Sequence, residues 1–393
     1  MKKLLTMLLV GIMSSVLLVT PAAYSSSEMP NALLLYVGTN SNHFWDPYPA
    51  FSNNDLDKIL DATQEFVIIN SNATYNYYQK NGTTTQIVSN SSINAIQSSD
   101  IQFPNTLANI KEDYLGLLSS AGSYPSVTLD KSVSAQVELA KQIISREPNA
   151  TIWFSFPTVT FQACAQHYKE PFTYMFNQIK SQIGTTAWNK NVRGFYWGTE
   201  AVTSYYTKFD EGAPGNYYNN RMIQLMADIG NLVHNNNKQF MWIPYNTKDT
   251  ETSSLYTFIR AGYVANKTNI FDYVTIQPGY YQNSDMSNQL NYVKKSAQDN
   301  KFYNNSGGVV GGTKTSSTKI GAEMEIDSKI AGGSNWQGYN DRYYEYTVRF
   351  KPLRGSTPFT FYAGDRDSLM NSTVLYYVTD FRLIRATKIP FHS

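Results

Sequence analysis

The chain has 393 residues, enough for one large domain or two of ordinary size. Its 32 basic and 30 acidic residues leave a net charge of +2, which argues against electrostatic binding of nucleic acid, and its 42% hydrophobic content argues against general disorder. Cys164 is the single cysteine, so no internal disulfide can form and the core alone must stabilise an exported chain.

The N-terminus has the three parts of a secretory signal peptide. Lysines precede an apolar run from Leu4 to Val19, and small residues follow at Ala23 and Ser25. We therefore expect a signal peptide over residues 1–25 and a secreted mature chain, with an uncleaved anchor as the alternative. No later stretch is apolar over the ~18 residues of a membrane span, so we expect no membrane span in the mature protein.

Eight short apolar runs of β-forming residues follow, most of them separated by a segment with helical spacing. In chain order the runs are Ala32–Thr39, Glu65–Asn70, Thr151–Phe156, Gly194–Glu200, Phe240–Asn246, Asp272–Gln277, Lys319–Asp327 and Pro358–Gly364. The helical segments are Ser132–Arg146, Phe172–Ile183, Tyr218–His234, Ser253–Ala261, Met286–Asn300 and Asn340–Phe350. Continuous apolar runs are typical of strands covered on both faces, so the alternation predicts a (β/α)8 TIM barrel, as a single domain over residues 26–393. An open doubly wound sheet is the alternative, although no GxGxxG sequence follows the first run.

A long insertion at about residues 72–132 separates the second predicted strand from its helix. It begins with a tract rich in Asn, Ser and Thr and contains a segment with helical spacing, Leu107–Leu118. Loops that follow barrel strands lie on the face where active sites form. The insertion is therefore expected to form a lid or a wall of a binding site, with a mobile surface loop as the alternative.

Carboxylates gather at the predicted carboxyl ends of two strands. The fourth run ends at Glu200, and the seventh places Glu323, Glu325 and Asp327 on one face, because side chains alternate along a strand. Glycoside hydrolysis needs two carboxyl groups across the scissile bond, one as acid and one as nucleophile or base. We expect Glu200 to be the acid, Glu325 its partner and Glu323 a deeper supporting group. A salt-bridge network and a cation site are the alternatives.

Polar and aromatic residues near the ends of the runs are expected to bind substrate, because flat aromatic faces suit sugar rings. They are Asn40, Trp197, Trp242, Tyr245, Asn246, Gln277, Tyr280, Tyr281, Asp327 and Asp365. No histidine pair is spaced for zinc, and no P-loop, GxSxG or HExxH sequence occurs. We therefore expect neither a cofactor nor a metal site.

Seven motifs occur in order between about residues 32 and 386: KEDYLGLLSSAG, LDKSVSAQVELAKQI, TIWFSFP, GFYWGTE, FMWIPYN, VTIQPGYY and GAEMEID. This series resembles the bacterial family known as domain of unknown function 4855. The resemblance implies a glycosidase-like barrel and a pairing of Glu200 with the seventh strand, and it implies no particular substrate. The insertion and the Gly-rich loop at 304–317 depart from the family.

These features favour a secreted glycoside hydrolase that cleaves an extracellular polysaccharide or glycoconjugate through two carboxylates, with retention of configuration. A barrel that binds glycans without cleaving them is the first alternative. A metal-assisted hydrolase that uses the same acids is the second. Fold by itself does not decide among the three.

Overall fold

A computed structural model describes residues 29–37, 51–70, 74–75, 78–81, 84–87, 116–118, 127–159, 168–202, 221–245, 258–304, 306–333, 335–364 and 366–382. Eight parallel strands close into a barrel, in which β1 pairs with both β2 and β14. The strands are β1 (Asn31–Val37), β2 (Glu65–Asn70), β8 (Thr151–Ser155), β10 (Val192–Trp197), β11 (Gln239–Trp242), β12 (Tyr273–Ile276), β13 (Lys319–Glu325) and β14 (Phe359–Tyr362). The prediction of a TIM barrel is confirmed.

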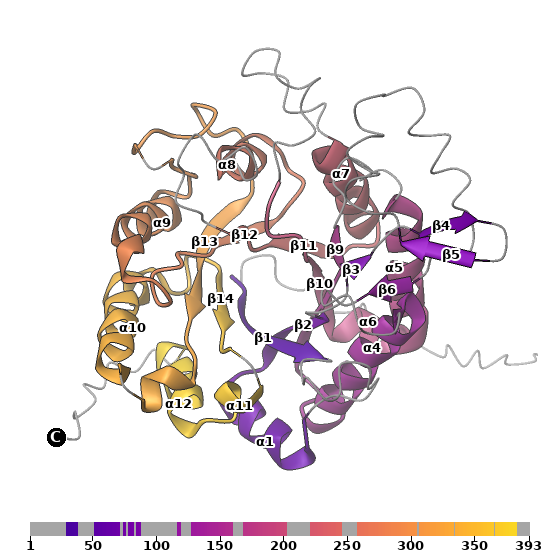
Figure 1. The fold of residues 1–393 in the computed structure, drawn as a ribbon, viewed down its shortest axis with the longest axis horizontal. Helices are drawn as coiled ribbons and strands as arrows, with labels where there is room; N and C mark the ends of the chain where they lie inside the picture. Colours follow the sequence, from indigo (N-terminus) through magenta and orange to yellow (C-terminus); the bar gives the residue numbers. More distant parts are fainter. Residues whose placement is uncertain are drawn as a thin grey trace, which may run out of the picture.

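Helices form a ring outside the strands (Figure 1). They are α1 (Asn53–Ala62), α4 (Leu129–Arg146), α5 (Lys169–Ile183), α6 (Thr185–Lys190), α7 (Arg221–His234), α8 (Phe258–Lys267), α9 (Ser287–Asp299), α10 (Trp336–Phe350), α11 (Arg366–Leu369) and α12 (Ser372–Arg382). Short 3-10 turns include η4 (Ser328–Ala331) after β13. Within the described part of the chain, no helix has the length and apolarity that a membrane crossing requires.

Most barrel strands contribute to two separate apolar cores, whereas β13 contributes only to the one between strands and helices. Along β1, Leu33 and Leu35 belong to the core between strands and helices, whereas Ala32 and Leu34 belong to the core inside the barrel. This division follows from the two-residue period of a strand, and it explains why most of the runs are apolar throughout. Whether a side chain reaches the inside of the barrel therefore depends on its place in the alternation of faces along the strand.

A polar cluster closes the barrel at the amino ends of its strands. Arg193 of β10 is 5% exposed and pairs with Glu65 of β2 at 3.0 Å. The same guanidinium donates to Gln239 at 2.8 Å and to the Tyr273 hydroxyl at 3.2 Å, while Trp153 donates to Glu65 at 2.9 Å. Buried charges are tolerated when they are paired and hydrogen-bonded in this way. We call Glu65, Trp153, Arg193, Gln239 and Tyr273 the barrel floor.

The predicted insertion contributes strands to two small sheets beside the barrel. One has the order β7 (Val127–Thr128), β6 (Gly116–Leu118), β3 (Thr74–Tyr75) and β9 (Thr158–Val159), and the other pairs β4 (Tyr78–Asn81) with β5 (Thr84–Ile87). The helical prediction for Leu107–Leu118 is wrong at residues 116–118, because their backbone pairs with β3 and β7 instead. Residues 107–115 lie outside the described residues. The helix α4 begins at Leu129, inside the range predicted for the insertion.

Candidate active site

Two glutamates of β13 point into the barrel. Ile320, Ala322 and Met324 face the helices, so Glu323 and Glu325 take the opposite parity and lie inside, 3% and 6% exposed. The strand runs from the floor toward the carboxyl ends, which makes Glu323 the deeper of the two. The sequence-based placement of these carboxylates on one inward face is in agreement with this geometry.

Glu200 lies beyond the carboxyl end of β10, from which Gly198 and Thr199 separate it. Its carbonyl accepts the backbone N–H of Tyr245 at 2.9 Å, so the segments that follow β10 and β11 are joined at this point. The side chain is exposed to solvent, yet the surrounding protein still raises its pKa above the ordinary value through desolvation. A hydrogen bond from Gln277 partly offsets that effect.

The three glutamates interact electrostatically. Burial raises the pKa of Glu323 well above its ordinary value, and the charges of Glu325 and Glu200 raise it further. Burial also raises the pKa of Glu325, to about 7, and the charge of Glu200 adds to this shift. Carboxyl groups that repel one another in a site of low polarity do not all ionise together, so at least one of them holds a proton near neutral pH.

Glu325 differs from Glu323 because hydrogen bonds favour its charged form. The Tyr346 hydroxyl of α10 donates to Glu325 Oε2 at 2.5 Å. Hydrogen bonds from the backbone of Gly279 and Tyr281 also lower the pKa of Glu325 against the effect of burial. Within the β13 pair, Glu323 therefore keeps its proton more tightly, and Glu325 is the carboxyl that ionises.

Tyrosines that the sequence analysis did not select as site residues complete the interior of the site. Tyr196 of β10 is buried, and burial and the nearby charge of Glu200 raise its pKa well above the ordinary value. Tyr36 of β1 packs edge-to-face on Tyr362 of β14 with ring centroids 6.0 Å apart. Burial and the charge of Glu323 raise the pKa of Tyr36 well above its ordinary value. Strand parity is the signal that would have found Tyr36 and Tyr362.

Two tryptophans that were predicted to stack on sugar rings lie in the core instead. Trp197 and Trp242 are fully buried in the core between strands and helices, where Trp197 contacts Phe172 and Trp242 stacks on Phe271 at 5.3 Å. The register of β8 and β10 shifts between Val192 and Gly194, and Tyr196 rather than Trp197 then faces inward. Neither tryptophan presents a ring face to a ligand.

Asp327 and Tyr281 hold the rim of the barrel together. The Tyr281 hydroxyl donates to Asp327 Oδ1 at 2.9 Å, and Gln282 and Lys329 bind Oδ2 at 3.2 and 3.1 Å. Although burial raises the pKa of Asp327, these hydrogen bonds lower it below its ordinary value overall. Tyr281 is 0% exposed, and the polar groups of both residues already have partners within the protein.

Tyr245 and Gln277 lie where the sequence analysis expected them. They form a parallel bridge beside Glu200, and the Tyr245 side chain is 44% exposed. Tyr280 is partly buried, and its hydroxyl donates to Glu345 of α10 at 2.6 Å. Asn40, Asn246 and Asp365 lie outside the described residues.

No group of three or more His, Cys, Asp or Glu side chains in the described ranges is arranged to hold a metal ion.

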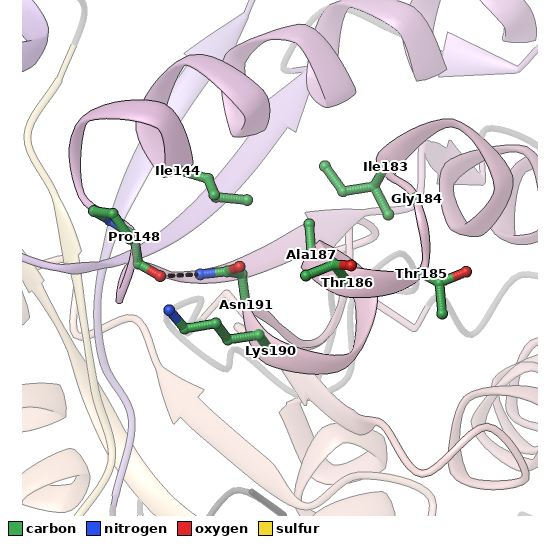
Figure 2. Close-up of a pocket in the computed structure, with 9 residues that line it drawn as sticks. All are labelled: Ile144, Pro148, Ile183, Gly184, Thr185, Thr186, Ala187, Lys190 and Asn191. Carbon is green, nitrogen blue, oxygen red and sulfur yellow. Dashed lines mark hydrogen bonds between the residues drawn. The ribbon is translucent and has the colours of Figure 1, made fainter. Parts of the chain in front are cut away.

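A hollow of about 380 Å³ lies near the amino ends of β8 and β10, and Figure 2 shows the residues that line it. Its walls are mainly apolar, from Ile144, Ile183 and Ala187, and Asn191 donates to the carbonyl of Pro148 at 3.0 Å. Lys190 is the only charged residue that lines it. A hollow without carboxylates cannot perform acid–base hydrolysis, so the candidate active site is the mouth of the barrel.

No protein-family model and no curated protein matches the chain. Among solved structures, it is similar to a family 5 xyloglucanase from Paenibacillus pabuli, with 12% identity, coverage of 91% of this chain and 99% of that chain, and a TM-score of 0.42. It is also similar to a sugar phosphate isomerase/epimerase from Parabacteroides distasonis (8% identity, 91% and 96% coverage, TM-score 0.39). A GH18 chitinase from Flavobacterium johnsoniae matches with 11% identity, 90% and 94% coverage and a TM-score of 0.34. Likenesses this distant carry no argument about activity, which has to be argued from the residues described above.

Proposed function

We propose that this protein is a secreted glycoside hydrolase that cleaves an extracellular polysaccharide or glycoconjugate. The observation that carries the proposal is the meeting of Glu200 with the Glu323–Glu325 pair at the carboxyl ends of barrel strands, with the pKa of every one of these carboxyls raised. Groups that titrate closer to neutral pH than ordinary carboxyls are suited to general acid–base catalysis.

In this proposal Glu200 protonates the leaving group and Glu325 attacks the anomeric carbon. Glu200 has access to solvent, which lets it receive and return protons between the two half-reactions. Glu325 is held by three hydrogen-bond donors, which suits a carboxylate that must reach its target from a fixed position. Glu323 remains protonated below it and supports it. Such a double displacement retains the configuration at the anomeric carbon.

Three further features belong to the proposal. Residues 1–25 act as a signal peptide, and the chain belongs to the family of domain of unknown function 4855, a proposal that the motif series alone supports. Tyr245 provides a stacking surface for a sugar ring, since an exposed aromatic ring beside the acid offers an apolar face at the place where a glycan would enter. The same exposed ring would also serve a glycan-binding protein without catalysis, which is the second candidate function.

The test is turnover on a panel of aryl glycosides and polysaccharides with the wild type, Glu200→Gln and Glu325→Gln. Loss of either group should lower kcat by about 10²- to 10⁴-fold while glycan binding persists. Glu170→Gln, at an exposed position in the first turn of α5, is the matched control and should keep full activity. Binding without turnover in the wild type would identify the glycan-binding protein instead.

Added azide separates the two roles. In Glu200→Ala, azide should intercept a covalent intermediate and give a glycosyl azide of retained configuration. In Glu325→Ala, azide should replace the missing nucleophile and give the inverted product. If the configurations are exchanged between the two variants, the assignment of roles is wrong although the hydrolase proposal stands.

A further inference from the structure

Helix α10 holds the segment that follows β12. Arg342 donates from Nε to the carbonyl of Tyr281 at 2.8 Å, and Glu345 accepts the Tyr280 hydroxyl at 2.6 Å. Next to Glu345 along the helix, the Tyr346 hydroxyl accepts the Tyr281 N–H at 3.1 Å. Three side chains from about one turn of the helix thus fix Tyr280 and Tyr281, and the backbone of Tyr281 is itself hydrogen-bonded to Glu325.

The proton of the Tyr346 hydroxyl has a defined direction. Its oxygen already accepts the N–H of Tyr281, so its single proton is free to be donated to Glu325 Oε2, at the short distance of 2.5 Å. The side chain is 0% exposed, and its ring meets those of Tyr280 and Phe350 edge-to-face with centroids 6.1 Å away in each case. The hydroxyl therefore has little freedom to turn away from the carboxyl.

The backbone on the other side of the carboxyl also holds Glu325. Gly279 has a φ of +66°, in the left-handed region that glycine adopts without strain, and its N–H is one of the donors to Glu325. Glu325 thus lies between a helix side chain and a turned loop. The titratable groups that face it are Glu323 on its own strand, Glu200 after β10 and Tyr346 of α10.

We propose that Tyr346 is a positioning residue that fixes the Glu325 carboxylate and makes Glu325, rather than Glu323, the ionised member of the β13 pair. The inference rests on the proposed function for its catalytic consequence, although the effect on ionisation is independent of any substrate. Tyr346 itself transfers no proton and makes no bond to the sugar. It acts by stabilising the charged form of its neighbour.

The first test measures ionisation directly. The carboxyl ¹³C signal of Glu325, assigned by its loss in Glu325→Gln, is followed through a pH titration in the wild type, Tyr346→Phe and Tyr343→Phe. Tyr343 is the matched control, because it is fully buried in the same helix and its hydroxyl donates instead to the carbonyl of Tyr377 at 3.2 Å. The pKa of Glu325 should rise by about one unit in Tyr346→Phe only. Equal values in both variants would overturn the inference.

The second test uses catalysis. Tyr346→Phe should lower kcat by about 10-fold, leave KM nearly unchanged, and move the acidic limb of the pH profile upward by the same amount as the measured pKa. An unmoved limb would contradict the inference. If the wild type cleaves no glycan, the proposed function fails while the titration still decides the role of Tyr346.

A third measurement covers the case in which Tyr346→Phe does not fold. The ¹³Cζ signal of Tyr346 in the wild type should shift with the ionisation of Glu325 and should lose this shift in Glu325→Gln. A Tyr346 signal whose chemical shift does not change as Glu325 ionises would overturn the inference. This measurement requires no substitution of Tyr346.

Discussion

Replacing Glu325 with glutamine tests whether a charge is buried inside the barrel. Burial raises the pKa of this carboxyl from 4.5 to about 7 in the folded protein. A carboxyl whose pKa is raised by folding has no effect on stability below its unfolded pKa, and it lowers stability progressively as the pH rises through its folded pKa. At about 1.4 kcal/mol per pKa unit, the full loss above neutral pH is about 3 kcal/mol.

Glutamine has nearly the same shape and no charge, so the variant escapes this loss. We expect the free energy of unfolding of Glu325→Gln, relative to the wild type, to increase by about 3 kcal/mol between about pH 4.5 and about pH 8. Comparing the two pH values cancels any pH-independent change in packing or hydrogen bonding. Removing the charge at this position also lowers the pKa of Glu323, which acts in the same direction.

The assay is urea unfolding followed by the fluorescence of the 6 tryptophans, at a series of pH values. Glu170→Gln serves as the control, because its exposed carboxyl should give a difference that does not vary in this way. A difference for Glu325→Gln that is flat across the pH range would refute the reasoning, since it would mean that the folded protein leaves this carboxyl no harder to ionise than the unfolded chain.

Two further predictions concern the barrel itself. Arg193→Met should destabilise the protein by about 3–5 kcal/mol in chemical unfolding, because it leaves a buried carboxylate unpaired, whereas Arg146→Ala, at a solvent-exposed ion pair, should cost about 1 kcal/mol or less. Gly321→Ala places a methyl carbon 1.7 Å from the carbonyl oxygen of Pro358 and should lower the melting temperature, while Gly332→Ala meets no atom within 4 Å and should lower it far less. Equal effects within either pair would count against the packing described here.

The barrel could be predicted from the sequence because most of its strands are apolar on both faces. The run Glu65–Asn70 matches β2 at both ends, and the seventh run contains β13 entirely. Helix α1 was missed, although Ser52 and Asp55 form a capping box that marks its start. Its apolar face is short, and the capping box is the signal that would have found it.

The site was predicted only in part. Glu323 and Glu325 could be placed because parity along a regular strand is simple. The inward residue of β10 could not, since the register shifts between Val192 and Gly194 and Tyr196 rather than Trp197 then faces inward. Tyr346 lies on a helix, and its contact with Glu325 depends on how α10 packs, which local sequence does not encode. Asp327 was expected to bind substrate because of its charge, and the sequence does not show the internal partners that its carboxylate binds.

The barrel floor has a consequence for the movement of protons. Arg193 and Glu65 close the lower end with side chains that are themselves tied to their neighbours, so we expect the buried glutamates to exchange protons with water at the upper end. A proton that leaves Glu323 must travel upward, past Glu325 and toward Glu200. The upper glutamates thus lie on the path by which Glu323 exchanges its proton with water. After a change of pH, the ionisation of Glu323 should reach its new equilibrium more slowly than that of Glu325 and Glu200.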